Sequence, residues 1–80
     1  MDKKVAVIAV IVTKENAVSK INDLFHEFGE YIIGRLGLPH RERGINIINV
    51  VLDAPQEIIN SLSGKLGMID GAKSKVLLTK

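Results

Sequence analysis

The stretch from Tyr31 to Gly44 contains the residues whose types and spacing are best suited to chemistry. Three arginines, Arg35, Arg41 and Arg43, lie within nine residues of one another, and His40 stands beside the second of them. The planar fork of a guanidinium group matches the oxygens of carboxylates and phosphates. The stretch therefore predicts an anion-binding group, which serves either a small ligand or a salt bridge between subunits.

Two glycines surround the first of these arginines in the sequence. Glycine weakens the interior of a strand, and its presence there indicates a bulge or the close approach of another backbone or a ligand. The glycines are therefore expected to belong to the same ligand site or subunit contact as the basic residues. The candidate residues are Gly34, Arg35, Gly37, His40, Arg41 and Arg43.

The position of Arg35 on a strand predicts its neighbours. Alternate strand residues point to one face, so Arg35 is expected to share a face with Tyr31, Ile33 and Gly37. Pro39 is expected to stop the strand and turn the chain, so that the two later arginines return near the same end of the sheet. Three cations would then converge on one anionic group.

No transition-metal site is predicted. Asp23 and His26 are three residues apart on an expected helix, but two ligands on one turn are a common coincidence. The chain has no cysteine, and its second histidine, His40, lies among arginines that oppose a bound cation. His26 is therefore interpreted as a surface residue near the end of a helix, and no cofactor is expected.

Other motifs for catalysis or nucleic-acid binding are incomplete. Gly64-Lys65 lacks the upstream glycine and the following Ser or Thr of a phosphate loop, since these places hold Ile59 and Leu66. The apolar strands expected to be central have no aromatic residue on which RNA bases could stack. No nucleophile or acid-base pair has a recognisable motif around it, so an enzyme is not expected.

Hydrophobic periodicity predicts the elements that position these residues. Strands are expected at residues 4–12, 30–38, 45–52 and 71–79, and helices from Thr13, as N-cap, to Gly29 and from Asp53 to Gly67. The order strand, helix, strand, strand, helix, strand predicts an α+β fold, a ferredoxin-like βαββαβ sandwich. In it, two helices cover one face of an antiparallel four-stranded sheet. The chain is expected to form a single domain, residues 1–80.

The first and third of these strands are apolar on both faces, which predicts that they are the central pair. Two helices can cover only one face of the sheet, so the other would leave an apolar patch in water, which soluble monomers rarely carry. We therefore expect a homo-oligomer, a dimer or a tetramer, formed through the open face of the sheet.

Composition limits the remaining possibilities. The 80 residues carry 11 Lys and Arg against 9 Asp and Glu, a net charge of +2, which is weak for a dedicated nucleic-acid binder. Specific DNA binding by the chain alone is not expected. The longest apolar run, Val5–Val12, is far shorter than the roughly 20 residues of a membrane-spanning helix. No cleavage site of a secretory signal follows it, and we expect a cytoplasmic protein.

Nearly the whole chain resembles the regulators associated with the iron-only hydrogenase system, which have an ACT-like, ferredoxin-like fold. The run Ile32–Pro39, with its glycines and arginine, is the specific feature, followed by Arg41–Gly44. Supporting segments are Asn16-Ala17-Val18 with Lys20-Ile21-Asn22, and Leu62–Gly67. The fold is more distantly similar to the C-terminal domain of the nickel-responsive repressor, whose His and Cys cluster has no counterpart here.

The resemblance implies a regulatory or sensor module acting in transcription, and we expect an oligomeric, ligand-responsive domain without catalysis. The alternative is a general oligomeric module that binds a small ligand or anion and has no role in transcription. The genes that neighbour this one would distinguish the two hypotheses, because hydrogenase maturation genes beside it favour the regulator.

Overall fold

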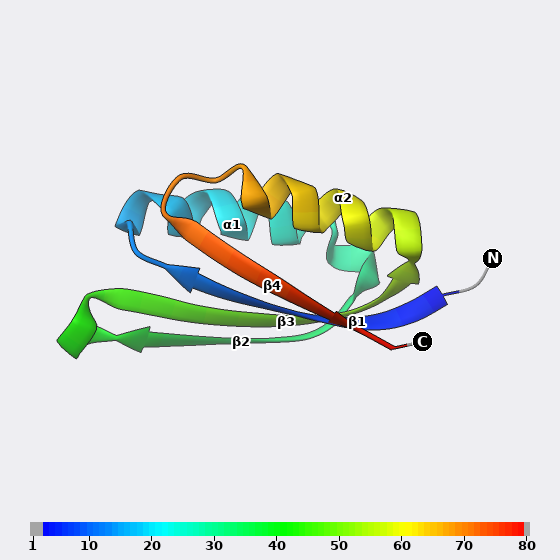
Figure 1. Cartoon of the computed structure of the whole chain (residues 1–80), viewed down its shortest axis with the longest axis horizontal. Helices are drawn as coiled ribbons and strands as arrows, with labels where there is room; N and C mark the ends of the chain where they lie inside the picture. The colour runs from blue at the N-terminus through cyan, green and yellow to red at the C-terminus, as the bar shows by residue number, and fades with distance from the viewer. Residues whose placement is uncertain (1–2, 80) are drawn as a thin grey trace.

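A computed structural model describes residues 3–79 as one antiparallel sheet with two helices over one of its faces (Figure 1). The strands are β1 (Lys3–Val12), β2 (Ile32–His40), β3 (Ile45–Pro55) and β4 (Ala72–Leu78). The helices are α1 (Glu15–Glu27) and α2 (Gln56–Gly67), with two 3-10 turns, η1 (Gly29–Tyr31) and η2 (Arg41–Arg43). This arrangement confirms the expected ferredoxin-like α+β fold. Neither described helix has the length and apolar character that crossing a membrane requires.

The sheet order is β2-β3-β1-β4, which confirms that the first and third strands are central. β1 pairs with β3 along its whole length, from Lys3 opposite Pro55 to Val12 opposite Asn46. On its other side β1 pairs with β4, and β3 pairs with β2. The two edges of the sheet are therefore β2 and β4.

Several element boundaries differ from the expected ones by one to three residues, and three of the differences have clear physical reasons. β2 does not stop at Pro39 but continues to His40, because an edge strand tolerates a proline whose nitrogen faces away from its partner. β3 extends past Leu52 to Pro55 because the start of β1 still pairs with it there. Thr13 is not the N-cap of α1: that position is Lys14, and the Thr13 hydroxyl donates to the Gly71 carbonyl (3.3 Å).

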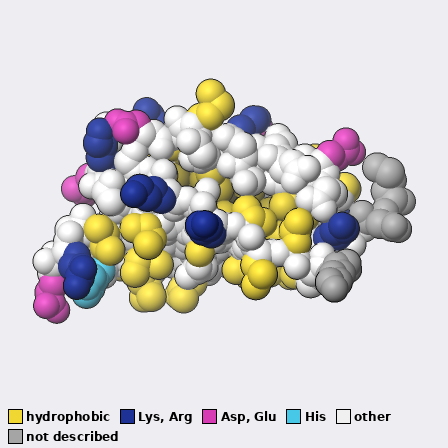
Figure 2. All heavy atoms as spheres, viewed as in Figure 1, with side chains coloured by type: hydrophobic (Ala, Val, Ile, Leu, Met, Phe, Trp, Pro, Cys, Tyr) yellow, Lys and Arg dark blue, Asp and Glu magenta, His cyan; other side chains and the backbone are white. Residues whose placement is uncertain are grey.

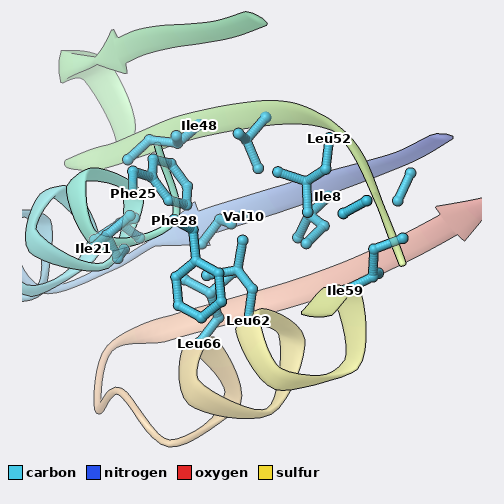
Figure 3. Packing of buried hydrophobic residues seen from close by; sticks show 14 of the residues in the cluster. Ile8, Val10, Ile21, Phe25, Phe28, Ile48, Leu52, Ile59, Leu62 and Leu66 are labelled. Atoms are coloured by element: carbon cyan, nitrogen blue, oxygen red, sulfur yellow. The ribbon is translucent and has the colours of Figure 1, made fainter. Parts of the chain in front are cut away.

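The core lies between the helices and one face of the sheet, with side chains from all layers pointing toward one another (Figure 3). Alternate residues of β1 and β3 form its floor, and the inner stripes of α1 and α2 close it. Its largest fully buried members are Ile8, Val10, Val12, Ile21, Phe25, Val50, Leu52, Ile59, Leu62 and Leu66. Phe28 is also buried, and in α1 Ala17 is buried while Val18 lies at the margin of the core.

The other face of the sheet is uncovered by the described chain and is rich in apolar side chains. We call it the open face. Its exposed large apolar residues are Val5, Val7, Ile11, Leu36, Leu38 and Leu77. Hydrophobic side chains accordingly gather below the strands in Figure 2. The central strands are therefore apolar on both faces, but only one of these faces is buried under the helices, and the other is the open face.

Gly71 lies in the turn before β4, and its carbonyl accepts hydrogen bonds from Thr13, which follows β1. We expect Gly71→Ala to destabilise the fold. Its φ of 90° is unfavourable for any other residue, and an added Cβ would lie 2.6 Å from the Lys14 Cβ. Its carbonyl also accepts the Thr13 N–H (2.7 Å). Strain of this kind costs of order 1–3 kcal/mol, which urea denaturation would measure.

Gly29→Ala is the matched control for this change, because the Gly29 φ is not positive and a Cβ there meets no atom within 4 Å. We expect its free energy of unfolding to stay within about 0.5 kcal/mol of the parent protein. Equal losses in the two variants would contradict the role assigned to Gly71.

Candidate functional site

The structure divides the predicted site residues into two groups. Gly34, Arg35 and Gly37 lie in the middle of β2, whereas His40, Arg41 and Arg43 lie at the tip of the β2–β3 hairpin. At about 3.3 Å per strand residue, Arg35 is roughly 20 Å from Arg41. The expected return of the chain at Pro39 was wrong because the strand continues, so the three arginines do not converge within one chain.

Arg35 points to the helix-covered side of the sheet, beyond its edge. It lies opposite Val50, whose side chain is buried under the helices. Its Nη2 donates a hydrogen bond to the Asn22 Oδ1 of α1 (2.7 Å), and its guanidinium carbon lies 4.9 Å from the centre of the Phe25 ring. Arg35 therefore attaches the edge strand β2 to α1, which has few other contacts with that strand.

A β-bulge corrects the predicted neighbours of Arg35. The ladder between β2 and β3 shifts between Ile32 and Gly34, which leaves Ile33 outside the regular alternation and two-thirds exposed. Tyr31 belongs to the turn η1 rather than to the strand. Only Gly37 shares the side of Arg35 as predicted, since it lies opposite a core residue of β3.

Two shallow hollows lie on either side of Arg35 along the groove between α1 and β2. One, of about 480 Å³, is lined by Asn22, Phe25, His26, Gly29, Ile32 and Arg35. The other, of about 260 Å³, is lined by Val18, Asn22, Arg35, Gly37, Leu38, Pro39, Asn46 and Ile48. The absence of a side chain at Gly37 keeps the second hollow open toward the edge of the sheet.

The second group of site residues borders a pocket of about 370 Å³ between the start of α1 and the tip of the hairpin. We call it the hairpin-tip pocket. His40 and Arg41 contribute from the hairpin, and Lys14 and Glu15 from the start of α1. Figure 1 shows the hairpin tip at this end of the molecule, and Figure 2 shows charged side chains gathered there. Arg43 is not among the residues that line the pocket.

Lys14 is already engaged on the far side of this pocket. Its ammonium group pairs with the Asp70 carboxylate in the turn before β4. The hydrogen bond from Lys14, followed by the charge of its ammonium group, holds the pKa of the Asp70 carboxyl below its usual value. His40 and Arg41 take part in neither of the two salt bridges found within residues 3–79, so no carboxylate of the described chain engages them in this way.

The basic side chains at the hairpin-tip pocket are chemically suited to a small anion.

Within the part of the chain that the structure describes, no three His, Cys, Asp or Glu side chains come together as a metal site. Two residues that were not predicted from the sequence join these groups: Asn22 of α1 accepts the hydrogen bond of Arg35, and Lys14, the N-cap of α1, lines the hairpin-tip pocket. Asn22 occupies an ordinary polar position on an amphipathic helix, and no pattern in the sequence indicated that it would face β2.

Comparison with known proteins identifies a family and a solved structure that is similar over nearly the whole chain. A family profile described as "TM1266-like: Iron-only hydrogenase system regulator, putative" matches residues 4–76. The structure of the uncharacterised protein TM1266 from Thermotoga maritima is 38% identical in sequence and superimposes with a TM-score of 0.93. This match covers 99% of this chain and 100% of that one. No curated protein matches the sequence.

Two other solved structures share the fold alone. A formyltetrahydrofolate deformylase from Pseudomonas putida KT2440 has a TM-score of 0.61 at 14% identity, over 92% of this chain and 28% of that one. The de novo designed protein Foldit4 has a TM-score of 0.60 at 15% identity, over 99% of this chain and 98% of that one. Together they show that the fold occurs in an enzyme and in a designed protein.

We expect Arg35→Ala to lower the free energy of unfolding by about 1 kcal/mol, because it removes an exposed hydrogen bond and a cation–π contact. Lys73→Ala on the opposite edge strand is the control, since Lys73 takes part in none of the side-chain hydrogen bonds or salt bridges within residues 3–79. Urea denaturation of both variants measures the difference. Equal stabilities would mean that Arg35 does not hold β2 to α1.

Proposed function

The chain belongs to the iron-only hydrogenase system regulator family, and from this we propose that it is a regulatory or sensor module that binds a small anion without catalysis. The observation that carries the proposal is the hairpin-tip pocket, whose lining includes His40 and Arg41 from the hairpin together with Lys14 and Glu15 from the start of α1. A guanidinium beside an imidazole is suited to a carboxylate or phosphate group. The volume of about 370 Å³ fits a small metabolite rather than a polymer.

A role in transcription would require a separate DNA-binding partner. The net charge of +2 is small, and Lys and Arg are spread over strands, helices and the hairpin rather than along one recognition helix. We infer that the module acts in the cytoplasm and transmits the presence of its ligand to another protein. Any binding to DNA by the chain alone would be weak, sensitive to salt and indifferent to sequence.

A general anion-binding module with no role in transcription is the second candidate. The same pocket supports it, because nothing about the side chains that line the pocket requires a transcriptional partner. The two candidates predict the same ligand chemistry and differ in the partner. Co-purification of the native protein with a DNA-binding protein would favour the regulator.

Calorimetric titration with inorganic phosphate and with malonate tests the pocket. We expect the parent protein to bind at least one of them and Arg41→Ala to weaken that affinity about tenfold or more, as loss of a charge-assisted hydrogen bond implies. Arg43→Ala is the matched control, because Arg43 carries the same charge two residues away but does not line the pocket. Equal weakening by the two changes would point to general charge attraction and contradict a site at Arg41.

We also propose that the protein is a homo-oligomer, a dimer or a tetramer, that buries the open face. Val5, Val7 and Ile11 of β1 are partly exposed on this face. Leu77 of β4 lies next to them, and Leu36 and Leu38 of β2 lie on the far side of β3. A stable interface covers about 800 Å² on each partner. A four-stranded face with an apolar centre offers a surface of that kind to a second copy.

Leu77→Asp tests this contact by placing a charge on the open face. Leu77 is 73% exposed, so the substitution should leave the fold intact while it shifts sedimentation toward the monomer. Met68→Asp is the control, since Met68 is 87% exposed at the end of α2, away from the open face. Oligomers that persist in Leu77→Asp, or a parent protein that is a monomer at micromolar concentration, would contradict this proposal.

A further inference from the structure

Arg35 has more hydrogen-bonding capacity than the described chain uses. The hydrogen bond that its side chain forms within residues 3–79 runs from Nη2 to the Asn22 Oδ1 (2.7 Å). It takes part in neither salt bridge of that part of the chain. Because the Asn22 amide accepts this bond through its oxygen, its NH2 group remains a donor. Arg35 and Asn22 together therefore present several N–H groups to the groove between α1 and β2.

The guanidinium group of Arg35 is held in place before any ligand binds. Its central carbon lies 4.9 Å from the centre of the Phe25 ring, and Phe25 is buried in the core. The hydrogen bond to Asn22 fixes the group from a second direction. A side chain that is already ordered loses less entropy on binding than a mobile one. Arg35 is therefore preorganised to receive an anion.

The two hollows beside Arg35 contain basic and neutral groups but no acidic ones. Arg35 and Asn22 border both hollows, and His26 borders the larger one. Among the described residues, no Asp or Glu lines either hollow. A guanidinium fork pairs best with the oxygens of a carboxylate or phosphate. The charge of the groove therefore favours an anion and offers nothing to pair with an ammonium group.

The smaller hollow, of about 260 Å³, supplies an apolar compartment next to this cation. Val18 of α1, Ile48 of β3 and Pro39 of β2 are among its lining residues. Gly37 borders it without a side chain, although its φ is not positive and an added Cβ would meet no heavy atom within 4 Å. Glycine inside a strand often marks a place where a ligand approaches closely. The space at Gly37 is therefore open to the apolar part of a ligand.

We propose that the groove between α1 and β2 binds a small carboxylic acid with an apolar body and no amino group. Its carboxylate pairs with Arg35 and the Asn22 amide, and its apolar body fills the hollow beside Gly37. A phosphate carries about two negative charges, whereas a carboxylate carries one, which matches the single arginine. The two hollows together have the size of a site for a small molecule.

This site is separate from the hairpin-tip pocket, although the two are adjacent. Pro39 and Asn46 border both the hairpin-tip pocket and the smaller hollow. Arg35 does not line the hairpin-tip pocket, and Arg41 lines neither hollow. The hairpin-tip pocket also has Glu15 in its lining, whereas the groove has no carboxylate. The two sites are therefore expected to prefer different ligands and to respond to different substitutions.

Calorimetric titration with three probes tests the chemistry of the ligand. 3-Phenylpropanoate has a carboxylate and an apolar body, acetate lacks the body, and phenylalanine adds an ammonium group. We expect 3-phenylpropanoate to bind at least about tenfold more tightly than either of the others. Equal binding of phenylalanine, or no binding of 3-phenylpropanoate at concentrations of about 10 mM, would overturn the proposal.

Gly37→Val tests the placement of the apolar body, because the new side chain would fill the hollow. It meets no atom within its own chain, so circular dichroism should show an intact fold. Gly34→Val is the matched control, since Gly34 lies opposite Val51 on the open face and lines neither hollow. We expect Gly37→Val to weaken the binding of 3-phenylpropanoate at least about tenfold and Gly34→Val to leave it unchanged. Equal effects of the two substitutions would contradict the site.

Arg35→Lys tests the carboxylate contact, since lysine keeps the charge but lacks the planar fork. We expect it to weaken the binding of 3-phenylpropanoate about fivefold or more, while the binding of phosphate or malonate stays as in the parent protein. Arg41→Ala should do the reverse, so failure of the hairpin-tip pocket and failure of the groove can be told apart. Unchanged binding of 3-phenylpropanoate in Arg35→Lys, or an equal loss in Arg41→Ala, would place its carboxylate elsewhere and refute the proposal.

Discussion

The antiparallel pairing of β1 with β3 is the interaction on which the rest of the structure depends. Ten residues of β1 find partners on β3, and pairs such as Ile8 with Val50 form the floor against which both helices pack. A slip of one residue would turn this apolar floor toward water. Within the described sheet, β2 pairs only with β3, and β4 pairs only with β1, so the register of the central pair sets where the two edge strands lie.

Covering one face of the sheet with both helices leaves two kinds of surface without a partner in the described chain. One is the open face, whose apolar side chains come from the same strands as the core. The other is the edge of β2, whose backbone groups have a partner only on the side of β3. Within residues 3–79 the two helices cover only one face of the four strands, so the association proposed above would add burial at the open face.

A single strand connects the features that matter for function. β2 carries His40 at the hairpin-tip pocket, Arg35 at the contact with α1, and the two glycines on its free edge. A ligand at the tip would therefore contact the same strand that Arg35 joins to α1. Coupling between two sites requires an element whose state both of them influence. A regulatory module of this size would need no catalytic machinery to transmit a signal in this way.

The sequence by itself determined the order of elements, the two central strands and most of the core, because period-two and period-3.6 apolar patterns reflect local geometry. It also singled out Gly34, Arg35 and Gly37 as unusual within a strand. Only the tertiary structure decided that Pro39 lies within β2, that a bulge displaces Ile33, and that Arg35 binds Asn22 rather than joining Arg41. These features depend on which strand lies beside β2 and which helix passes over it. Such contacts arise between residues far apart in the chain, and no local pattern of residue types encodes them.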